Sequence, residues 1–232
     1  MKRLKKLRFI LVYPLAIGLF LAARTTERSL LIGIVVVALG EALRLWANSY
    51  VGHVKVNRTE PWRGDAKIGQ LITAGPYAYV RHPLYLGTFL LGVGFCIIVG
   101  NRWLALLALL FFLVVYQRKM REEDAVILNE WGETFVRYQH AVLAWIPTWR
   151  RYADPQGKRS WEGILASKEL KTLAWVIVGV ILLYFREEFV QERESLWRQH
   201  RLKHIVLLGV AVALALGDGI YTLVHRQHRA GR

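Results

Sequence analysis

Six runs of mostly apolar residues divide this chain, and they limit its fold more than any other feature. A helix needs about 20 apolar residues to cross the hydrocarbon core of a bilayer, and about 17 is the lower end. Backbone polar groups inside a bilayer must be bonded within the chain, so such segments are helical. The runs predict an all-α integral membrane protein with about six transmembrane helices. They are Phe9 to Ala23, Leu30 to Ala47, Pro83 to Val99, Trp103 to Tyr116, Leu170 to Phe185 and Leu202 to Val224.

Composition supports a membrane location. The 232 residues are 54% hydrophobic, more than a soluble domain needs. The first run follows five basic residues, as in a signal peptide, but Arg24, Glu27 and Arg28 stand where a small-residue cleavage site would be, so we expect a retained helix. The single cysteine, Cys96, excludes an intrachain disulfide and a cysteine-based zinc site.

The excess of basic residues follows the expected topology. The formal net charge is +15. With six spans and a cytoplasmic amino terminus, the inside segments hold 22 Lys and Arg and the outside segments hold 8. This bias is the one that the positive-inside rule describes. We therefore expect a multi-pass protein with both termini in the cytoplasm, in the inner membrane if the source is prokaryotic, and no nucleic-acid partner.

Two long cytoplasmic segments hold the residues able to do chemistry. Residues 48–82 are rich in glycine and proline, which predicts a loop. Residues 117–147 predict an amphipathic helix that leaves the fourth span, runs to about Trp131, breaks at Gly132 and resumes to a stop at Pro147. Residues 152–160 predict a linker. We expect a cytoplasmic pocket between the loop and the helix that follows the fourth span.

The first motif is Gly75-Pro-Tyr-Ala-Tyr-Val-Arg-His-Pro-Leu-Tyr-Leu-Gly87, where the loop enters the third span. Pro83 suits the first turn of a helix, so Arg81 and His82 are expected at its amino-terminal rim. Free backbone amides and the helix dipole there favour an anionic group. An alternative is that these residues only anchor the chain at the membrane interface, where basic and aromatic residues gather.

Two further motifs have both a functional and a structural explanation. Glu122 and Glu123 are adjacent carboxylates after the fourth span, suited to binding a cation or hydroxyl groups, or to forming salt bridges with Arg118 and Lys119 on a solvated helix face. Gly92-Val-Gly94 lets a ligand or a neighbouring helix approach the third span closely.

Other polar residues in the apolar runs give weaker signals. Glu41 and Arg44 are one turn apart near the end of the second span, which mutual pairing or snorkelling would explain. Asp218 in the last span has no visible partner in the sequence. The closely spaced histidines near the carboxyl terminus lack a third ligand, so no metal site is expected.

The order of these motifs resembles the isoprenylcysteine carboxyl methyltransferase and phospholipid methyltransferase superfamily. The resemblance covers roughly residues 40–150 and also includes Arg121-Glu122-Glu123, Trp131-Gly132-Glu133, Tyr138 and Ile146-Pro147. It implies a membrane enzyme that transfers a methyl group from S-adenosylmethionine, giving S-adenosylhomocysteine. Residues 1–150 would form the methyltransferase core, with cofactor motifs in 69–94 and 118–147. Residues 151–232 would add a linker and a two-helix membrane hairpin.

The resemblance also implies roles for individual residues. Arg81 and His82 are the candidate catalytic residues, and Lys119 is the candidate for binding the substrate. Lys119 stands where the prenylcysteine enzymes carry an arginine thought to hold the substrate carboxylate. The implied cofactor-binding residues are Gln70, Leu71, Ile72, Tyr77, His82, Pro83, Leu84, Tyr85, Gly92, Gly94, Glu122 and Glu123.

The acceptor is expected to be a lipid or a lipidated small molecule that enters from the bilayer. Carboxyl O-methylation of an isoprenylcysteine-like substrate is favoured. N-methylation of an aminophospholipid and S-methylation of a thiol stay open, because lysine lacks the bidentate fork of arginine. A different class of function is a non-catalytic scaffold that binds a lipid or a partner helix, with the carboxyl-terminal hairpin as an element of homo-oligomer assembly.

Overall fold

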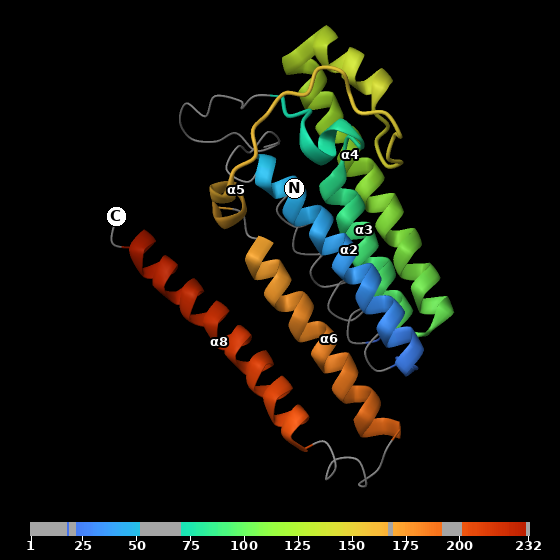
Figure 1. Ribbon diagram of the computed structural model, residues 1–232, viewed down its shortest axis with the longest axis vertical. Helices are drawn as coiled ribbons and strands as arrows, with labels where there is room; N and C mark the ends of the chain where they lie inside the picture. The colour runs from blue at the N-terminus through green and yellow to red at the C-terminus, as the bar shows by residue number, and fades with distance from the viewer. Residues whose placement is uncertain (1–17, 19–21, 52–70, 167–168, 192–200, 231–232) are drawn as a thin grey trace. The chain divides into compact units, whose positions relative to one another are not determined.

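The computed structural model describes residues 18, 22–51, 71–166, 169–191 and 201–230, and these form helices and loops without a strand (Figure 1). The predicted all-α class is confirmed for this part of the chain. The first apolar run falls almost wholly outside the described residues. The elements are α2 (Glu27–Val51), the 3-10 turn η1 (Gly75–Ala78), α3 (Pro83–Val99), α4 (Arg102–Ala141), α5 (Trp161–Ala166), α6 (Glu169–Gln191) and α8 (Arg201–Ala230).

One described helix, α2, is long and apolar enough to cross a membrane by itself. Helix α3 is also apolar but has only 17 residues. The apolar side chains of Leu31, Ile32 and Leu39 on α2 are each more than half exposed.

Helix α4 joins the predicted fourth span to the amphipathic helix that follows it. Gly132 interrupts it with φ 47° and ψ −125°, so the predicted break at this glycine is confirmed. The predicted end at Pro147 is wrong, because the helix ends at Ala141. The reason is tertiary: the carbonyls of Leu143 and Ala144 accept hydrogen bonds from the amides of Arg81 and His82 instead of continuing the helix.

The chain forms two compact units. One consists of Met1–Ile34, Gly94–Ala105 and Lys171–Arg232, and the other of Val35–Val93 and Leu106–Leu170. All described candidate site residues except Gly94 fall in the second unit, which is called the core unit below.

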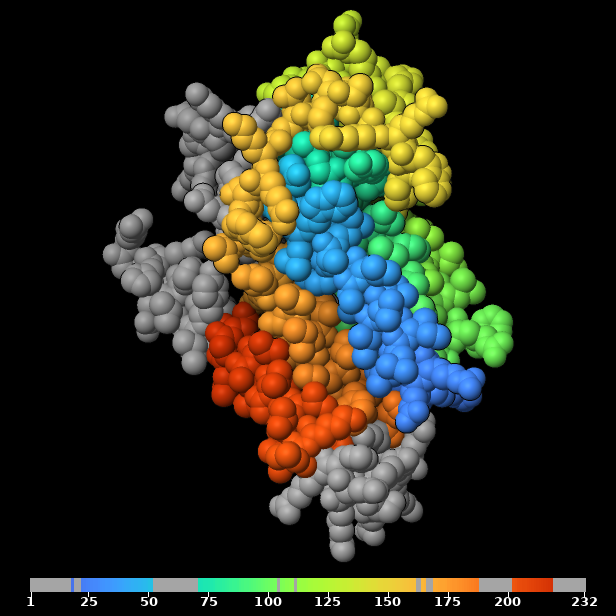
Figure 2. Space-filling view, viewed as in Figure 1, coloured from blue at the N-terminus to red at the C-terminus, as the bar shows by residue number. Residues whose placement is uncertain are grey.

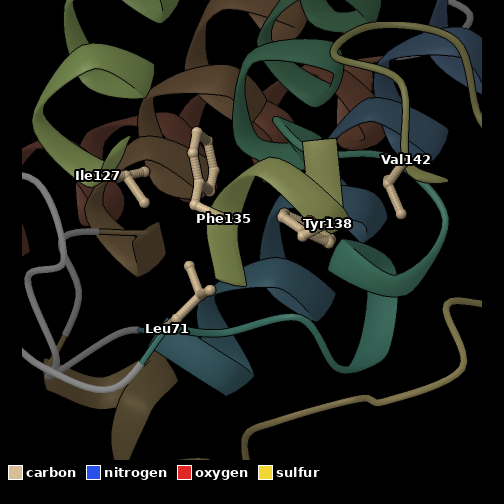
Figure 3. Close-up of a cluster of buried hydrophobic side chains, with 5 residues drawn as sticks. All are labelled: Leu71, Ile127, Phe135, Tyr138 and Val142. Carbon is tan, nitrogen blue, oxygen red and sulfur yellow. The ribbon is translucent and has the colours of Figure 1, made fainter. Parts of the chain in front are cut away.

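A buried cluster joins the loop of the core unit to the end of α4 (Figure 3). Leu71, just before η1, belongs to the same cluster as Ile127, Phe135, Tyr138 and Val142. The Tyr138 hydroxyl also donates to the Tyr77 carbonyl over 2.7 Å. The predicted loop is therefore packed on α4 from residue 71 onward.

Close packing of α2 and α3 in the core unit depends on two glycines. A β-carbon added at Gly40 would lie 2.8 Å from the Gly87 carbonyl oxygen and 2.9 Å from the Leu91 nitrogen. A side chain at either glycine would force the helices apart, as at small-residue contacts between membrane helices. This contact fixes the start of α3 against α2.

In the other unit, α6 and α8 pack through Val178, Ile181 and Ala211. Asp218 of α8, for which the sequence showed no partner, binds Lys171 over 2.8 Å and accepts a hydrogen bond from the Trp175 indole over 3.2 Å. The two helices thus carry their own ion pair, which explains how Asp218 is tolerated on an apolar helix.

Candidate active site

The motif at residues 75–87 bends sharply into α3. Gly75 has φ +63°, a left-handed conformation that glycine adopts without strain, and a β-carbon there would collide with the ring of Tyr50. Pro76 follows at the start of η1, and Pro83 is the first residue of α3, as predicted from the sequence. The amides of Arg81 and His82 donate to the Leu143 and Ala144 carbonyls over 2.8 and 3.2 Å, and the anion site expected at the amino-terminal rim of α3 stays a prediction.

Asp124 binds both side chains of the Arg81-His82 pair. One carboxylate oxygen lies 3.1 Å from Arg81 Nη2 and the other lies 3.0 Å from His82 Nε2. Arg81 Nη1 also donates to the carbonyls of Gln139 and Val142. The side chains of Arg81 and His82 are only 9% and 6% exposed. The pair is therefore enclosed, and its predicted catalytic role stays a prediction.

Glu123 points to a different partner. Its carboxylate accepts a hydrogen bond from the hydroxyl of Tyr85, in the first turn of α3. The Lys119 ammonium lies 5.7 Å from the centre of the Tyr85 ring. Burial, with smaller contributions from Tyr138 and Glu123, raises the pKa of the Tyr77 phenol above its usual range, so Tyr77 is neutral. A carboxylate, two phenols and an ammonium thus surround the start of α3.

Glu122 lies on a solvated face of α4. It accepts a hydrogen bond from Arg118 over 3.1 Å, and the two side chains are 56% and 85% exposed. The salt-bridge pairing offered as an alternative from the sequence is therefore present for Glu122. Its assignment to the cofactor stays a prediction.

The other candidate residues lie in several environments. Leu71, Ile72 and Pro83 are buried and Leu84 is half-buried, whereas Gln70 lies outside the described residues. Gly92 faces open space, since nothing lies within 4 Å of an added β-carbon. The Gly94 carbonyl, in the other unit, would lie 2.7 Å from a β-carbon at Gly33. The Gly94 backbone thus lies close to Gly33, while Gly92 leaves room beside α3, and the assignment of both glycines to the cofactor stays a prediction.

Half-buried aromatic rings continue from Tyr85 along α3 and α4. The centre of the Tyr116 ring is 5.2 Å from that of Tyr85 and 4.0 Å from that of Phe112, on which it stacks. Phe89 and Trp145 extend the row, with ring centres 6.0 Å apart. Tyr85, Phe89 and Gly92 share one face of α3 by their spacing. An apolar surface therefore leads from Glu123 toward the middle of the apolar helix.

A second buried polar cluster lies between α2, α3 and the start of α6. The Arg44 guanidinium binds Glu169 through two bonds of 2.5 and 3.0 Å and also donates to the Thr88 hydroxyl. Asn48 adds a bond of 2.9 Å to Glu169. Glu41 lies 3.8 Å from Arg44 and is 3% exposed, and among the described residues its oxygens have no hydrogen-bond partner.

Sequence reasoning missed Asp124 and Glu169. Asp124 directly follows Glu122 and Glu123 in the sequence, and no role of its own was predicted for it. Successive helical residues point about 100° apart, so its position already indicated a different neighbour from that of Glu123. Nothing in the sequence pointed to Glu169, because it lies 125 residues from Arg44.

Comparison with known proteins finds similarity to one family over part of the chain. Residues 28–134 match the model of the phospholipid methyltransferase family. A protein-S-isoprenylcysteine O-methyltransferase of Schizosaccharomyces pombe is 34% identical over 77 residues, 33% of either chain. The enzyme of that name from Xenopus laevis is 28% identical over 120 residues, 50% of this chain and 40% of its own. The nickel-cobalt-cadmium resistance protein NccN of Alcaligenes xylosoxydans xylosoxydans is 29% identical over 118 residues, which are 51% of this chain and 49% of its own.

The resemblance to the isoprenylcysteine carboxyl methyltransferase and phospholipid methyltransferase superfamily is thus confirmed for this region. The chain spans about a third to a half of the length of these relatives. No solved structure matches it.

Proposed function

We propose that the protein is a multi-pass integral-membrane methyltransferase that uses S-adenosylmethionine, with its cofactor pocket on the cytoplasmic side. The observation that carries the proposal is the contact between the Tyr85 hydroxyl and Glu123, beside Tyr77 and Lys119. The contact joins two motifs 38 residues apart in the sequence. Such a site at the cytoplasmic end of α3 suits a soluble cofactor and a membrane-bound acceptor.

The residues present fit this cofactor chemically. The cofactor has an ammonium and ribose hydroxyls, which a carboxylate such as Glu123 can bind. When bound, it supplies a methyl group on a sulfonium. The protein must then align the acceptor with that group and exclude water. The half-buried aromatic rings beside Tyr85 form an apolar surface suited to that exclusion.

We propose a carboxylate on an isoprenylcysteine-like molecule as the acceptor. A carboxylate is ionised at neutral pH and needs only a cation to orient it, and Lys119 supplies one beside Tyr85. The aromatic row of Phe89, Phe112 and Trp145 gives an isoprenoid chain an apolar surface next to that cation.

An aminophospholipid acceptor is the second candidate, because the matching family model is that of the phospholipid methyltransferases. An ammonium must lose a proton before it accepts a methyl group. His82 and Glu123 are the candidate bases, but His82 already binds Asp124 and Glu123 binds Tyr85. The carboxylate acceptor needs neither residue as a base and is therefore preferred.

Replacing Glu123 with glutamine should abolish most of the cofactor affinity. The change removes the negative charge and keeps the volume, and one charged hydrogen bond accounts for about 10- to 100-fold in binding. The measurement is calorimetric titration of S-adenosylhomocysteine into the detergent-purified protein. Glu130→Gln, on an exposed position of the same helix, is the matched control and should bind like the wild type.

Two outcomes would contradict the proposal. Equal affinity in the wild type and Glu123→Gln would remove Glu123 from the site. An absence of binding to a folded wild-type protein would favour the non-catalytic scaffold, in which the carboxyl-terminal hairpin serves assembly.

Replacing Lys119 with alanine should slow turnover about tenfold while changing the affinity for S-adenosylhomocysteine less than twofold. The reason is that Lys119 is proposed to orient the acceptor rather than the cofactor. Methylation of a farnesylcysteine derivative and calorimetry on the same preparation give the two quantities, and Lys119→Arg should restore turnover. Equal losses of turnover and cofactor affinity would place Lys119 at the cofactor instead.

A further inference from the structure

Residues 148–160 run along the segment of the core unit that contains η1 and are called the strap. Figure 2 shows them in yellow and orange beside the blue-green segment 71–80. The Thr148 amide donates to the Tyr79 carbonyl over 2.7 Å, and the Tyr152 amide donates to the Ala78 carbonyl over 2.9 Å. The Ser160 amide donates to the Ser49 carbonyl of α2 over 2.7 Å. The strap lies beyond residue 134, where the match to the family model ends.

The middle of the strap bonds Thr73 most extensively. The amides of Thr73 and Ala74 both donate to the Gln156 carbonyl, over 2.9 and 3.0 Å. The Thr73 hydroxyl accepts from the Gln156 amide over 2.8 Å and donates to the Asp154 carbonyl over 3.1 Å. Thr73 is 2% exposed. One buried hydroxyl therefore connects two backbone groups of the strap to the segment that begins at Leu71.

The strap also fits closely against the neighbouring side chains. Gly157 has φ +121°, and a β-carbon there would lie 3.0 Å from Ile72 Cδ1 and 3.8 Å from the Ala74 side chain. No larger residue fits this turn without moving Ile72. Leu71 also packs in the buried cluster with Phe135 and Tyr138.

Backbone groups in a buried segment need partners, and residues 73 and 74 find them in the strap rather than in a helix. Their position therefore depends on Asp154 and Gln156, which no candidate motif included. Loss of the strap would remove the hydrogen bonds that hold residues 73 and 74 and the packing of Tyr152 on the Leu71 cluster.

We propose that the strap positions the cofactor-binding segment and that Thr73 is its positioning residue. Through Thr73, the strap holds Leu71 and Ile72 where the cofactor contacts them. The inference rests on the proposed function. It extends the site to residues outside the family-matched region.

The test compares Thr73→Val, which keeps the shape and removes the hydroxyl, with Thr73→Ser, which keeps the hydroxyl. Removing two hydrogen bonds should weaken S-adenosylhomocysteine binding about tenfold in the valine variant. The KM for S-adenosylmethionine should rise by a similar factor while kcat at saturation changes less than twofold. Thr73→Ser should bind within about twofold of the wild type, because it retains both bonds. Gln156→Ala is the control, since the strap uses only backbone groups of Gln156 to bind Thr73.

The outcomes separate this inference from the proposed function. Wild-type protein that does not bind S-adenosylhomocysteine would overturn the proposed function. Wild-type binding together with equal affinity in a folded Thr73→Val would overturn only the role of Thr73. If the valine variant fails to fold, hydrogen exchange on the wild type decides. Added S-adenosylhomocysteine should slow exchange of the Thr73, Ala74 and Gln156 amides, and unchanged exchange there would overturn the inference.

Discussion

Replacing Arg44 with alanine is expected to destabilise the protein by about 3–5 kcal/mol, the usual cost of removing one partner from a buried ion pair. Arg44 holds both oxygens of Glu169 and lies 3.8 Å from Glu41. Glu169 and Glu41 are 5% and 3% exposed. Without the guanidinium, the buried carboxylates of Glu169 and Glu41 would lose the cation that lies beside both of them, and their repulsion would add to the cost of burial.

Thermal unfolding of the detergent-purified variant measures this effect. Arg118→Ala is the matched control, because Arg118 pairs with Glu122 on an exposed face and should contribute at most about 1 kcal/mol. Adding Glu169→Gln to Arg44→Ala should recover part of the loss, since it removes one of the uncompensated charges. An Arg44→Ala variant as stable as Arg118→Ala would show that the Arg44-Glu169 pair does not support the fold.

Local rules of sequence predicted much of this fold. Apolar runs of the right length predicted α2 and α3, and Pro83 marked the first residue of α3 because proline fits the first helical turn. Gly132 marked the break in α4, where the left-handed backbone favours glycine. Each of these features depends on residues within a few positions of one another, so a single sequence contains the necessary information.

The remaining features depend on contacts between distant residues. The end of α4 at Ala141 is set by Arg81 and His82, whose amides bond the carbonyls of residues 143 and 144. Thr73 is tied to Gln156, 83 positions away. Hydrophobic periodicity and motif spacing carry no information about such partners. Individual side-chain roles in the site were therefore less accessible to sequence reasoning than the helices that carry them.

The three consecutive carboxylates of α4 show this difference most clearly. Successive helical residues point about 100° apart, so Glu122, Glu123 and Asp124 have different surroundings. Glu122 is exposed with Arg118, Glu123 binds Tyr85, and Asp124 binds Arg81 and His82. The sequence alone suggested one shared role for the adjacent glutamates.

Replacing Asp124 with alanine should therefore cost about 3–5 kcal/mol of stability, because it leaves the Arg81 charge buried without its carboxylate. Glu122→Ala should cost at most about 1 kcal/mol, as expected of an exposed pair. Thermal unfolding of the two variants in one detergent gives the comparison. Equal stabilities would contradict the bridging role of Asp124.

Cofactor binding in the same variants separates support of the site from contact with the ligand. Asp124 acts through Arg81 and His82, so added S-adenosylhomocysteine should raise the unfolding temperature of Asp124→Ala less than that of the wild type. Glu123→Gln should retain stability and lose the ligand-induced shift, because Glu123 is proposed to contact the ligand itself. Glu122→Ala should keep the full shift. Loss of the shift in Glu122→Ala would instead assign Glu122 to the cofactor, and its pairing with Arg118 would then have to open when the ligand binds.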